Sequence, residues 1–476
     1  MTTVNRLLLK PLMTALFVVM CALVAQAQFL RSSYFMDAAQ YGQQLNPAMT
    51  PAYGYVHLPG VGNTSVSFWS NGLSLNDVLD VIKNEDDNDY FTRDRFISRL
   101  KDTNYASINA GTDIIAAGWW HGKTFMTVNL SVKVSAGARM PQALFSFMRD
   151  VRGLSNVDYA DYECHIGGED VDVTAYTELG LGYSRPVDDR LTLGGRIKLL
   201  LGLGNARLRV RTLDVKTNLE GIPADYNWAS GDPSTPLQST GTASVDVDAD
   251  LECNFDGLTL PTSGQGYIDE LEFKPAHMGI SGAGAAIDAG LAWRAVGGLT
   301  FSAAVVDLGF IRWSKGSTRI AHSKSENLHF DSQEPDDISR FADVIGGSDP
   351  ININVLRLYP EKKGTKSRLT SVASTIVFGA DYAFAQDKFR IGALYTHRYA
   401  PVEAESEVTF SVNYTPSSQI GLTASYSPVL SGGQSLGLAV KAGPLFVGTD
   451  YIFTGMNTKC CNALVGLSIP LDKGPQ

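Results

Sequence analysis

Residues 407–426 read EVTFSVNYTPSSQIGLTASY. On both sides of the Pro416-Ser417 pair, apolar side chains occupy every second position, with Glu, Thr, Ser, Asn, Gln or Gly between them. Strict alternation that is interrupted by turn-forming residues predicts two antiparallel strands joined by a tight turn. The same pattern recurs in three other segments: 389–395, 436–440 and 463–469. We therefore expect an all-β fold.

The connections between the strand-like segments distinguish a soluble β-sandwich, which buries its apolar rows, from a membrane barrel, which turns them toward lipid. Short turns are expected at six places: 121–122, 188–189, 297–298, 386–387, 416–417 and 443–444. Longer connections alternate with them: about 70–104, 138–171, 205–280, 314–368, 400–404, 429–433 and 455–461. Short periplasmic turns and long outer loops are typical of outer-membrane barrels, and this assignment gives about fourteen strands. The sequence predicts a transmembrane antiparallel β-barrel, with twelve or sixteen strands as alternatives. A tall soluble sandwich would leave the regular alternation unexplained.

Two strand-like runs, 205–216 and 242–251, fall inside one outer connection and are expected to extend strands above the membrane. At Gly204 the apolar row switches from odd to even positions, which predicts a bulge or an exit from lipid. The first strand is expected near residues 63–69.

The N-terminus has the layout of a secretory signal peptide. Two basic residues, Arg6 and Lys10, precede an apolar run over 12–24, and residues 25–27 read AQA, a small-x-small cleavage site. The run is too short for a good transmembrane helix. We expect residues 1–27 to be removed, a mature chain that starts at Gln28, and a final location in the bacterial outer membrane.

Charge and cysteine content narrow the class of partner. Without the signal peptide the chain has 37 basic and 49 acidic residues, a net charge of −12, which disfavours nucleic acid because its binding usually needs a basic face. Four cysteines remain, all in segments that we interpret as loops: Cys164, Cys253, Cys460 and Cys461. No CxxC spacing occurs, so zinc is not expected, and a disulfide is allowed in this compartment. Cys21 offers a lipoprotein alternative, but Met20 stands where a lipobox needs a small residue.

Signatures of enzymes and metal sites are missing from the sequence. HExxH, GxSxG and GxxxxGK[ST] do not occur. Residues 202–207 read GLGNAR and lack the third glycine of a dinucleotide loop. Residues 84–89, NEDDND, would suit calcium, but the EF-hand glycine and distal glutamate are absent, so a solvated acidic loop is favoured. We expect no catalytic residue, no metal and no cofactor, with a barrel protease or lipase as the enzymatic alternative.

Several segments resemble those of an uncharacterised family of Bacteroidota outer-membrane proteins. They are LRSSYF at 30–35, QLNPA at 44–48, SNGLSL at 70–75 and DLGFIRW at 307–313. The Asn-Pro-Ala element is also similar to one near the N-terminus of the long-chain fatty-acid transporter superfamily. That resemblance implies a fourteen-stranded barrel with an N-terminal hatch inside it. A related branch includes a barrel of the type IX secretion pathway, which binds secreted proteins rather than small molecules.

The hatch is expected in residues 28–62, ahead of a barrel over 63–476. Residues 28–62 lack sustained alternation, and a barrel of this size is wide enough to need filling. Asn46 and Pro47 would fix the turn of the hatch. The alternative is a linker that leads into the first strand with ordinary turn chemistry.

Four charged residues stand on the rows of predicted strands that face away from lipid: Glu178, Arg196, Lys198 and Asp307. A charge at the bilayer midplane costs a few kcal/mol, so we expect these residues to face the lumen. Antiparallel pairing around the 188–189 turn brings Glu178 near Lys198, with Arg196 one step away. Ion pairs that hold a filled barrel together are the favoured interpretation, and the lining of a substrate path is the alternative.

The second long connection contains ALFSFMR at 143–149, whose apolar spacing predicts an amphipathic helix. In fatty-acid transporters, outer-loop helices form an apolar capture groove. A similar groove here would use four residues: Leu144, Phe145, Phe147 and Met148. The alternative is a helix that caps the barrel mouth. Two further short helices are expected in the first long connection, around 75–82 and 92–100.

The leading functional hypothesis is the capture and transport of hydrophobic small molecules, with outer-membrane lipid and a hydrophobic ligand as partners. One alternative is a protein-binding barrel in type IX secretion or envelope assembly, whose partner would be a secreted or periplasmic protein. The other alternative is a structural barrel without cargo.

Overall fold

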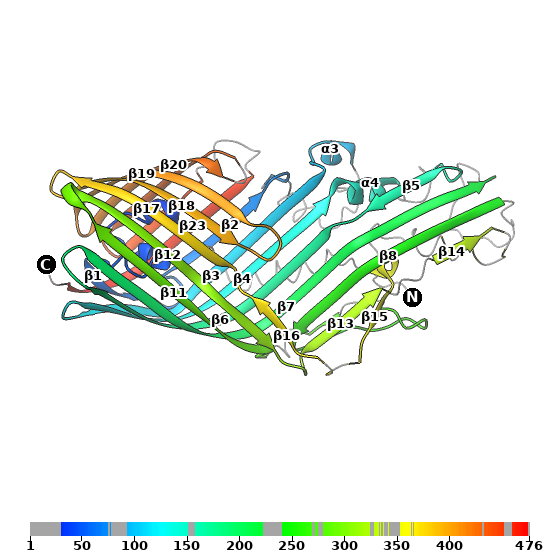
Figure 1. Cartoon of the computed structure of the whole chain (residues 1–476), viewed down its shortest axis with the longest axis horizontal. Helices are drawn as coiled ribbons and strands as arrows, with labels where there is room; N and C mark the ends of the chain where they lie inside the picture. Colours follow the sequence, from blue (N-terminus) through cyan, green and yellow to red (C-terminus); the bar gives the residue numbers. More distant parts are fainter. Residues whose placement is uncertain are drawn as a thin grey trace.

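Antiparallel strands pair with their neighbours along the chain until the last strand meets the first (Figure 1). β23 (Cys460–Lys473) pairs with both β1 (Tyr53–His57) and β2 (Thr64–Ser70), and these two strands also pair with β3 (Thr103–His121). β1 and β2 thus share one position in a closed wall of 14 strands. The predicted transmembrane barrel is confirmed.

The remaining wall strands follow in chain order: β4 (Thr124–Pro141), β6 (Glu169–Pro186), β7 (Leu191–Glu220), β11 (Gly282–Arg294), β12 (Leu299–Trp313), β16 (Arg368–Ser371) continued by β17 (Ser374–Phe384), β18 (Phe389–Tyr399), β19 (Glu405–Ser417), β20 (Ile420–Leu430), β21 (Ser435–Ala442) and β22 (Leu445–Thr449). Strands outside the wall are β5 (Tyr162–Ile166), β8 (Thr240–Phe255), β9 (Leu258–Thr259), β10 (Glu272–Phe273), β13 (Thr318–Ser323), β14 (Leu328–Asp331) and β15 (Leu358–Pro360). Helical segments are η1 (Arg31–Ser33), η2 (Gln40–Gln44), α3 (Asp94–Ile97), α4 (Gln142–Asp150), η6 (Val296–Gly298) and η7 (Ile353–Leu356).

The computed structural model describes residues 30–74, 77, 93–150, 158–221, 240–268, 272–274, 279–323, 328–332, 334, 337, 341, 353–362, 364, 366–430, 433–451 and 459–474. The predicted signal peptide, the acidic segment 84–89 and most of the predicted helix 75–82 lie outside these residues. Of the predicted helix 92–100, residues 94–97 form α3. No helix in the described part of the chain is long and apolar enough to span a membrane.

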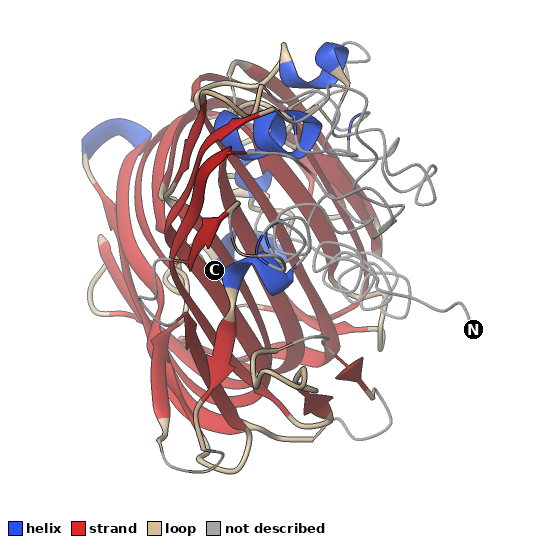
Figure 2. Cartoon of the chain, turned by 90° about the vertical axis from the view of Figure 1, so that its right-hand side faces the viewer, coloured by secondary structure: helices blue, strands red, loops and turns tan. Residues whose placement is uncertain are grey.

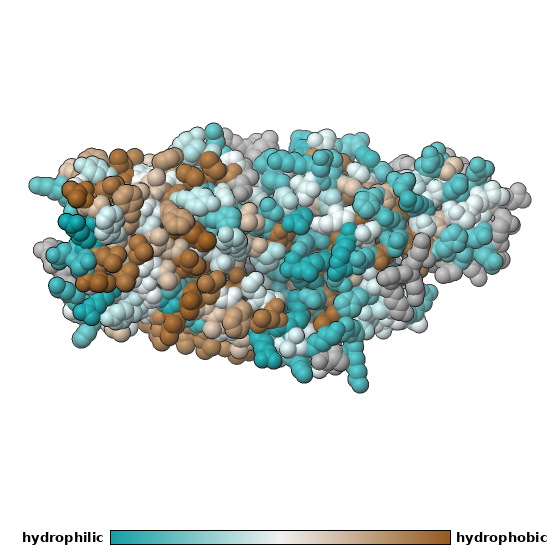
Figure 3. All heavy atoms as spheres, in the orientation of Figure 1, coloured by the Kyte–Doolittle hydropathy of each residue, from teal (hydrophilic) through white to brown (hydrophobic). Residues whose placement is uncertain are grey.

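The apolar side chains of the wall strands face outward and the polar side chains face inward, which is the reverse of the arrangement in a soluble protein. On β19 the apolar Phe410 and Val412 are 50% and 51% exposed, whereas the polar Thr409 and Asn413 are each 1% exposed. Figure 3 shows apolar residues gathered over the left part of the molecule, where most of the wall strands lie, and a hydrophilic right part. Polar side chains therefore fill the inside and apolar side chains face lipid, which rules out the sandwich alternative.

The strand ends agree with the predicted turns, and one boundary is corrected. All six short turns lie between successive wall strands, although β19 runs through Ser417 and its turn follows at 418–419. Residues 53–57 already pair in the wall as β1, so the sheet begins before the predicted boundary at residue 62. The short alternation of β1 between two prolines, at 51 and 59, hides it in the sequence.

β7 and β8 extend the sheet far beyond the lipid-facing belt (Figure 1). β7 has 30 residues, which at about 3.3 Å per residue give a strand of about 100 Å. At the predicted switch the register slips, because Ala175 pairs with Gly204 and Tyr176 with Gly202, so Leu203 is an extra residue. We call the part of the sheet beyond this bulge, which β7 and β8 form with β5, β13, β14 and β15, the extension. It has its own apolar core, which includes Val215, Val245 and Phe330. The predicted strand extensions and the bulge are confirmed.

The four cysteines lie in strands rather than in the loops that we expected. Cys164 is in β5, Cys253 in β8, and Cys460 and Cys461 begin β23. All four are free thiols. Cys253 and Cys461 continue alternating apolar rows, Val245 to Leu251 and Ala463 to Ile469 respectively, so the alternation could have placed these two in strands.

Residues 30–49 enter the barrel and fill part of it. Leu30, Tyr34, Phe35 and Leu45 are each at most 2% exposed, and Figure 2, which looks at the end that carries the extension, shows helical turns inside the ring of strands. The segment packs against the wall through apolar clusters that include residues of β17, β18, β21 and β22.

Candidate functional site

Six charged side chains from five neighbouring strands meet inside the barrel. Lys198 Nζ lies 2.6 Å from Asp307 Oδ1 and 2.8 Å from Asp288 Oδ2. Lys133 Nζ lies 2.8 Å from Glu178 Oε2 and 3.3 Å from Asp307 Oδ1. We call this group the charge cluster, and its sixth member is Arg196, whose Nη1 lies 3.3 Å from Asp288 Oδ2. Three cations thus balance three carboxylates in a buried place, where an unpaired charge would be costly.

The structure places all four predicted lumen charges in the charge cluster. Glu178 Oε2 and Lys198 Nζ are 3.7 Å apart. In the sheet Lys198 pairs with Gly180, which is the next inward-facing residue of β6 after Glu178. The sequence reasoning missed Lys133 and Asp288. Both residues occupy positions of their strands that face the lumen, so the alternation that identified Glu178 could have identified them too.

Asp307 sits in a bulge of β12. Ile287 pairs with Leu308 and Ala289 with Val305, so two residues of β12 oppose Asp288 alone. Asp307 adopts φ 58°, a left-handed conformation that is unfavourable for a residue other than glycine. Its amide donates a 2.7 Å hydrogen bond to Asp288 Oδ1. Charge-cluster contacts therefore hold this backbone conformation in place.

The hydrogen-bonded wall is interrupted beside the bulge. β12 pairs with β17 before residue 307 and with β16 after residue 309. Residues 372–373, between β16 and β17, leave the ladder, and the Val372 amide donates a 3.2 Å hydrogen bond to the Gly309 carbonyl. We call residues 307–309 and 372–373 the wall interruption.

Apolar side chains lie on both sides of the wall interruption. Inside the barrel an inner apolar cluster, each member at most 7% exposed, consists of Tyr176, Leu200, Ala286, Ile311, Trp313 and Val372. On the lipid side, Leu308 and Phe310 are 54% and 49% exposed, and Leu369 on β16 is 67% exposed. Apolar side chains thus lie on both faces of the wall where its hydrogen-bonded ladder is interrupted.

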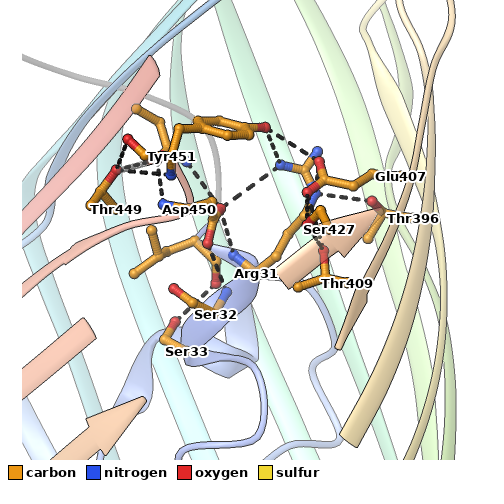
Figure 4. A network of polar contacts seen from close by, with 12 residues as sticks. Arg31, Ser32, Ser33, Thr396, Glu407, Thr409, Ser427, Thr449, Asp450 and Tyr451 are labelled. Carbon is orange, nitrogen blue, oxygen red and sulfur yellow. Dashed lines mark hydrogen bonds and ion pairs between the residues drawn. The ribbon is translucent and has the colours of Figure 1, made fainter. Parts of the chain in front are cut away.

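The N-terminal segment is tied to the wall by the contacts that Figure 4 shows. The backbone amides of Arg31 and Ser32 donate to the Asp450 carboxylate at 3.0 and 2.8 Å. Arg31 Nε lies 3.1 Å from Glu407 Oε2 and donates a 3.0 Å bond to Thr396 Oγ1. Asp450 and Glu407 are each 1% exposed, so Arg31 is the cation that makes their burial tolerable.

The predicted turn residues of the hatch sit on two glycines of the wall. Asn46 Nδ2 donates a 3.1 Å hydrogen bond to the Leu291 carbonyl. A Cβ atom at Gly290 would lie 2.1 Å from Asn46 Oδ1, and one at Gly194 would lie 2.4 Å from the Pro47 carbonyl carbon. The wall therefore needs glycine at both positions for this turn to approach.

The predicted amphipathic helix forms as α4. Phe145, Phe147 and Met148 are 1–4% exposed, and the rings of Phe145 and Phe96 of α3 lie 5.4 Å apart. Leu144 is half-buried beside them. These side chains pack against α3 and the core of the extension, as in a helix that caps the barrel mouth.

The chain matches one protein family and is similar to several solved structures. A family model described as "Family of unknown function (DUF5723)" matches residues 47–450. No curated protein sequence matches the chain. Among solved structures, the chain is similar to the "TodX deltaS2S3 mutant monoaromatic hydrocarbon channel", with a TM-score of 0.42, 10% identity, and 90% of this chain and 94% of that chain covered.

Two further solved structures have lower scores. The P. putida toluene transporter TodX has a TM-score of 0.38 and 9% identity, with 91% of this chain and 94% of that chain covered. A Pseudomonas aeruginosa FadL homologue has a TM-score of 0.34 and 10% identity, with 89% and 90% covered. At these scores the assignment of the fold depends on the strand pairing itself.

Proposed function

The chain belongs to the DUF5723 family, whose function is unknown, and from the geometry of the barrel we propose that the protein passes hydrophobic small molecules across the outer membrane. The cargo would cross the wall at the wall interruption. The single observation that carries this proposal is the interruption of the ladder between two apolar faces, the inner apolar cluster on one side and the exposed Leu308, Phe310 and Leu369 on the other.

The neighbouring features fit this route. Residues 30–49 fill part of the lumen, so the barrel is not a wide open pore. Missing ladder hydrogen bonds weaken the cohesion of the wall at the wall interruption, because each ladder bond contributes to strand cohesion. A hydrophobic molecule that reaches the inner apolar cluster can then enter lipid without crossing the polar periplasmic end of the barrel.

Val372→Gln tests the route, because it puts an amide into the inner apolar cluster at the wall interruption. Desolvating an unpaired amide costs about 1–3 kcal/mol, so uptake of an apolar fluorescent probe by proteoliposomes should fall by roughly fivefold or more. The matched control is Val210→Gln. Val210 has the same 6% exposure as Val372 but lies in the core of the extension.

Folding of each variant is checked by the shift in gel mobility between heated and unheated samples. Uptake that falls for Val372→Gln and persists for Val210→Gln supports the route through the wall. Equal uptake by wild type and a folded Val372→Gln variant, or no uptake by the wild type, contradicts the proposal.

The extension favours a second candidate function, the binding of a protein at the cell surface. Its separate apolar core supports a projecting module that lipid passage does not require. A shortened protein in which a two-residue turn replaces residues 212–247 distinguishes the two functions. If the shortened barrel still folds and takes up the apolar probe at the wild-type rate, the extension serves something other than passage; if uptake is lost while the barrel folds, the extension belongs to the transport route.

A further inference from the structure

The lipid-facing side of β12 ends on an exposed arginine. Its outward row runs from Phe301 through Phe310 to Arg312. In the sheet Arg312 pairs with Ala283 of β11 on one side and with the exposed Leu369 of β16 on the other. A cation thus follows directly on the apolar surface that the wall presents to lipid.

Arg312 stands at the height of a membrane surface. At the other end of the row, the rings of Phe301 and Trp293 stack with their centroids 6.0 Å apart, as in the aromatic girdle at the edge of an apolar belt. Ten ladder steps along β11 separate this aromatic pair from the pair that Ala283 makes with Arg312, which is about 33 Å along the strand. At a tilt of about 40° this length covers about 25 Å across the membrane, the height of the apolar belt. Arg312 therefore lies in the headgroup layer on the side of the long connections.

Two further cations stand beside Arg312. β12 leads into a tight turn that contains the exposed Lys315. Arg319 lies over the same turn, because its Nη1 donates a 2.9 Å hydrogen bond to the Gly316 carbonyl. Arg319 belongs to β13, which pairs with β8 where the extension leaves the barrel (Figure 1). We call Arg312, Lys315 and Arg319 the basic rim.

The basic rim carries more positive charge than its surroundings neutralise. None of its three members makes an ion pair with another residue in the described part of the chain. Asp256, in the turn after β8, is near enough to Arg319 to interact with it electrostatically. Against this carboxylate the three cations leave an excess of two positive charges, whereas the cations of the charge cluster inside the barrel are matched by carboxylates.

Short side chains lie on the lipid side of the wall below the basic rim. Ala283 and Ala285 face outward on β11. Ala285 pairs with Phe310 of β12 and with Leu199 of β7, which are 49% and 48% exposed. Methyl groups thus stand between two rows of longer side chains. An acyl chain that lies along these alanines would reach the basic rim with its polar end.

We propose that the basic rim binds the phosphate of a phosphorylated glycolipid in the outer leaflet of the membrane. Arginine forms charge-assisted hydrogen bonds with phosphate, and basic clusters next to a membrane-spanning segment recognise anionic lipid headgroups. The unneutralised charge calls for an anion, and the height of Arg312 places that anion in the headgroup layer. The site lies on the outside of the wall, so it does not depend on passage of a cargo through the barrel.

Native mass spectrometry of the detergent-solubilised protein tests this site, with lipid A, a bisphosphorylated glycolipid, as the probe. The wild type should bind one lipid A and should prefer it to lipid A from which the phosphates have been removed. Arg312→Gln should lower the affinity for lipid A by about fivefold, and replacement of all three cations of the basic rim by glutamine should lower it by about a hundredfold.

The matched control replaces three exposed cations at the periplasmic end, Lys123, Arg185 and Arg190, by glutamine. This variant has the same net charge as the triple variant of the basic rim. Arg185 is the counterpart of Arg312, because it follows the exposed Tyr183 on the outward row of β6. The control should bind lipid A like the wild type. If it loses as much affinity as the variant of the basic rim, lipid A responds to net charge alone and the proposal is wrong.

Inorganic phosphate, added at millimolar concentration, distinguishes a lipid headgroup from a free anion. It should leave lipid A bound, because the acyl chains also contribute to binding. Displacement of lipid A by phosphate, equal binding of the dephosphorylated lipid, or no binding of lipid A by the wild type overturns the proposal. Folding of each variant is checked by gel mobility with and without heating. Uptake of the apolar probe into vesicles without lipid A should be the same for the triple variant and the wild type, so the two proposals fail separately.

Discussion

Replacement of Lys198 by methionine removes the cation that three carboxylates share. Methionine keeps the length of the side chain and removes its charge. Lys198 Nζ lies 2.6, 2.8 and 3.7 Å from the carboxylate oxygens of Asp307, Asp288 and Glu178, and the side chain is 2% exposed. Lys133 and Arg196 then remain against three carboxylates, so one buried negative charge loses its counter-ion.

The expected loss of stability follows from that imbalance. Removal of one partner from a buried ion pair costs about 3–5 kcal/mol, because the other charge stays buried without compensation. The free energy of unfolding should therefore fall by about this amount. Lys198→Met combined with Asp288→Asn restores the balance of two cations and two carboxylates, and should recover a large part of the loss.

Urea unfolding in detergent micelles, followed by tryptophan fluorescence, measures the change. The matched control is Lys441→Met, since Lys441 is 9% exposed and inward-facing. Its Nζ donates a 2.7 Å hydrogen bond to the Gly443 carbonyl, and no ion pair of Lys441 occurs in the described part of the chain. Its loss should cost about 1 kcal/mol. If Lys198→Met costs no more than Lys441→Met, the charge cluster is not an electrostatically coupled unit.

Three further changes have expected outcomes. Burial raises the pKa of Glu169, in the extension, to about 7. The free energy of unfolding is therefore highest below the ordinary pKa of 4.5 and falls as the pH rises toward 7. Glu169→Gln should match the wild type near pH 4, and its free energy of unfolding should exceed that of the wild type by about 3 kcal/mol near pH 8. Gly290→Ala puts a methyl group 2.1 Å from Asn46 Oδ1 and should speed amide hydrogen exchange in residues 30–49, whereas Gly195→Ala, whose added carbon meets its nearest atom at 3.6 Å, should not. Arg31→Met leaves two buried carboxylates without their cation and should lower the free energy of unfolding by about 3–5 kcal/mol, with Arg31→Lys in between, as urea titration would show.

The wall of the barrel could be predicted because one rule governs it. In segments such as 407–426 a side chain at every second position faces lipid, and the constraint repeats along each strand without help from distant residues. The same parity placed Glu178, Arg196, Lys198 and Asp307 inside the barrel. Parity is local, so a single sequence suffices to apply it.

The features of the candidate site depend on contacts that sequence distance conceals. Asp450 accepts hydrogen bonds from the amides of Arg31 and Ser32, more than four hundred positions away, and no local pattern marks it. β1 is five residues long, too short for alternation to distinguish it from a turn-rich segment. The bulge at Asp307 moves the outward apolar row of β12 from odd positions, such as Phe301, to even ones, such as Leu308, but the pairing with β11 is needed to show which residues are involved.

Asp307 connects the charge cluster with the wall interruption. A left-handed residue other than glycine costs of order 1–3 kcal/mol and persists only where its surroundings impose it. Here Lys198 and Lys133 contact the Asp307 carboxylate, and Asp288 accepts the Asp307 amide hydrogen, so the charge cluster maintains the bulge at the wall interruption. Asp307→Asn would weaken both cation contacts and let β12 relax. We therefore expect this one substitution to slow apolar-probe uptake and to lower stability together. If Asp307→Asn lowers stability but leaves uptake at the wild-type rate, the charge cluster does not shape the wall interruption.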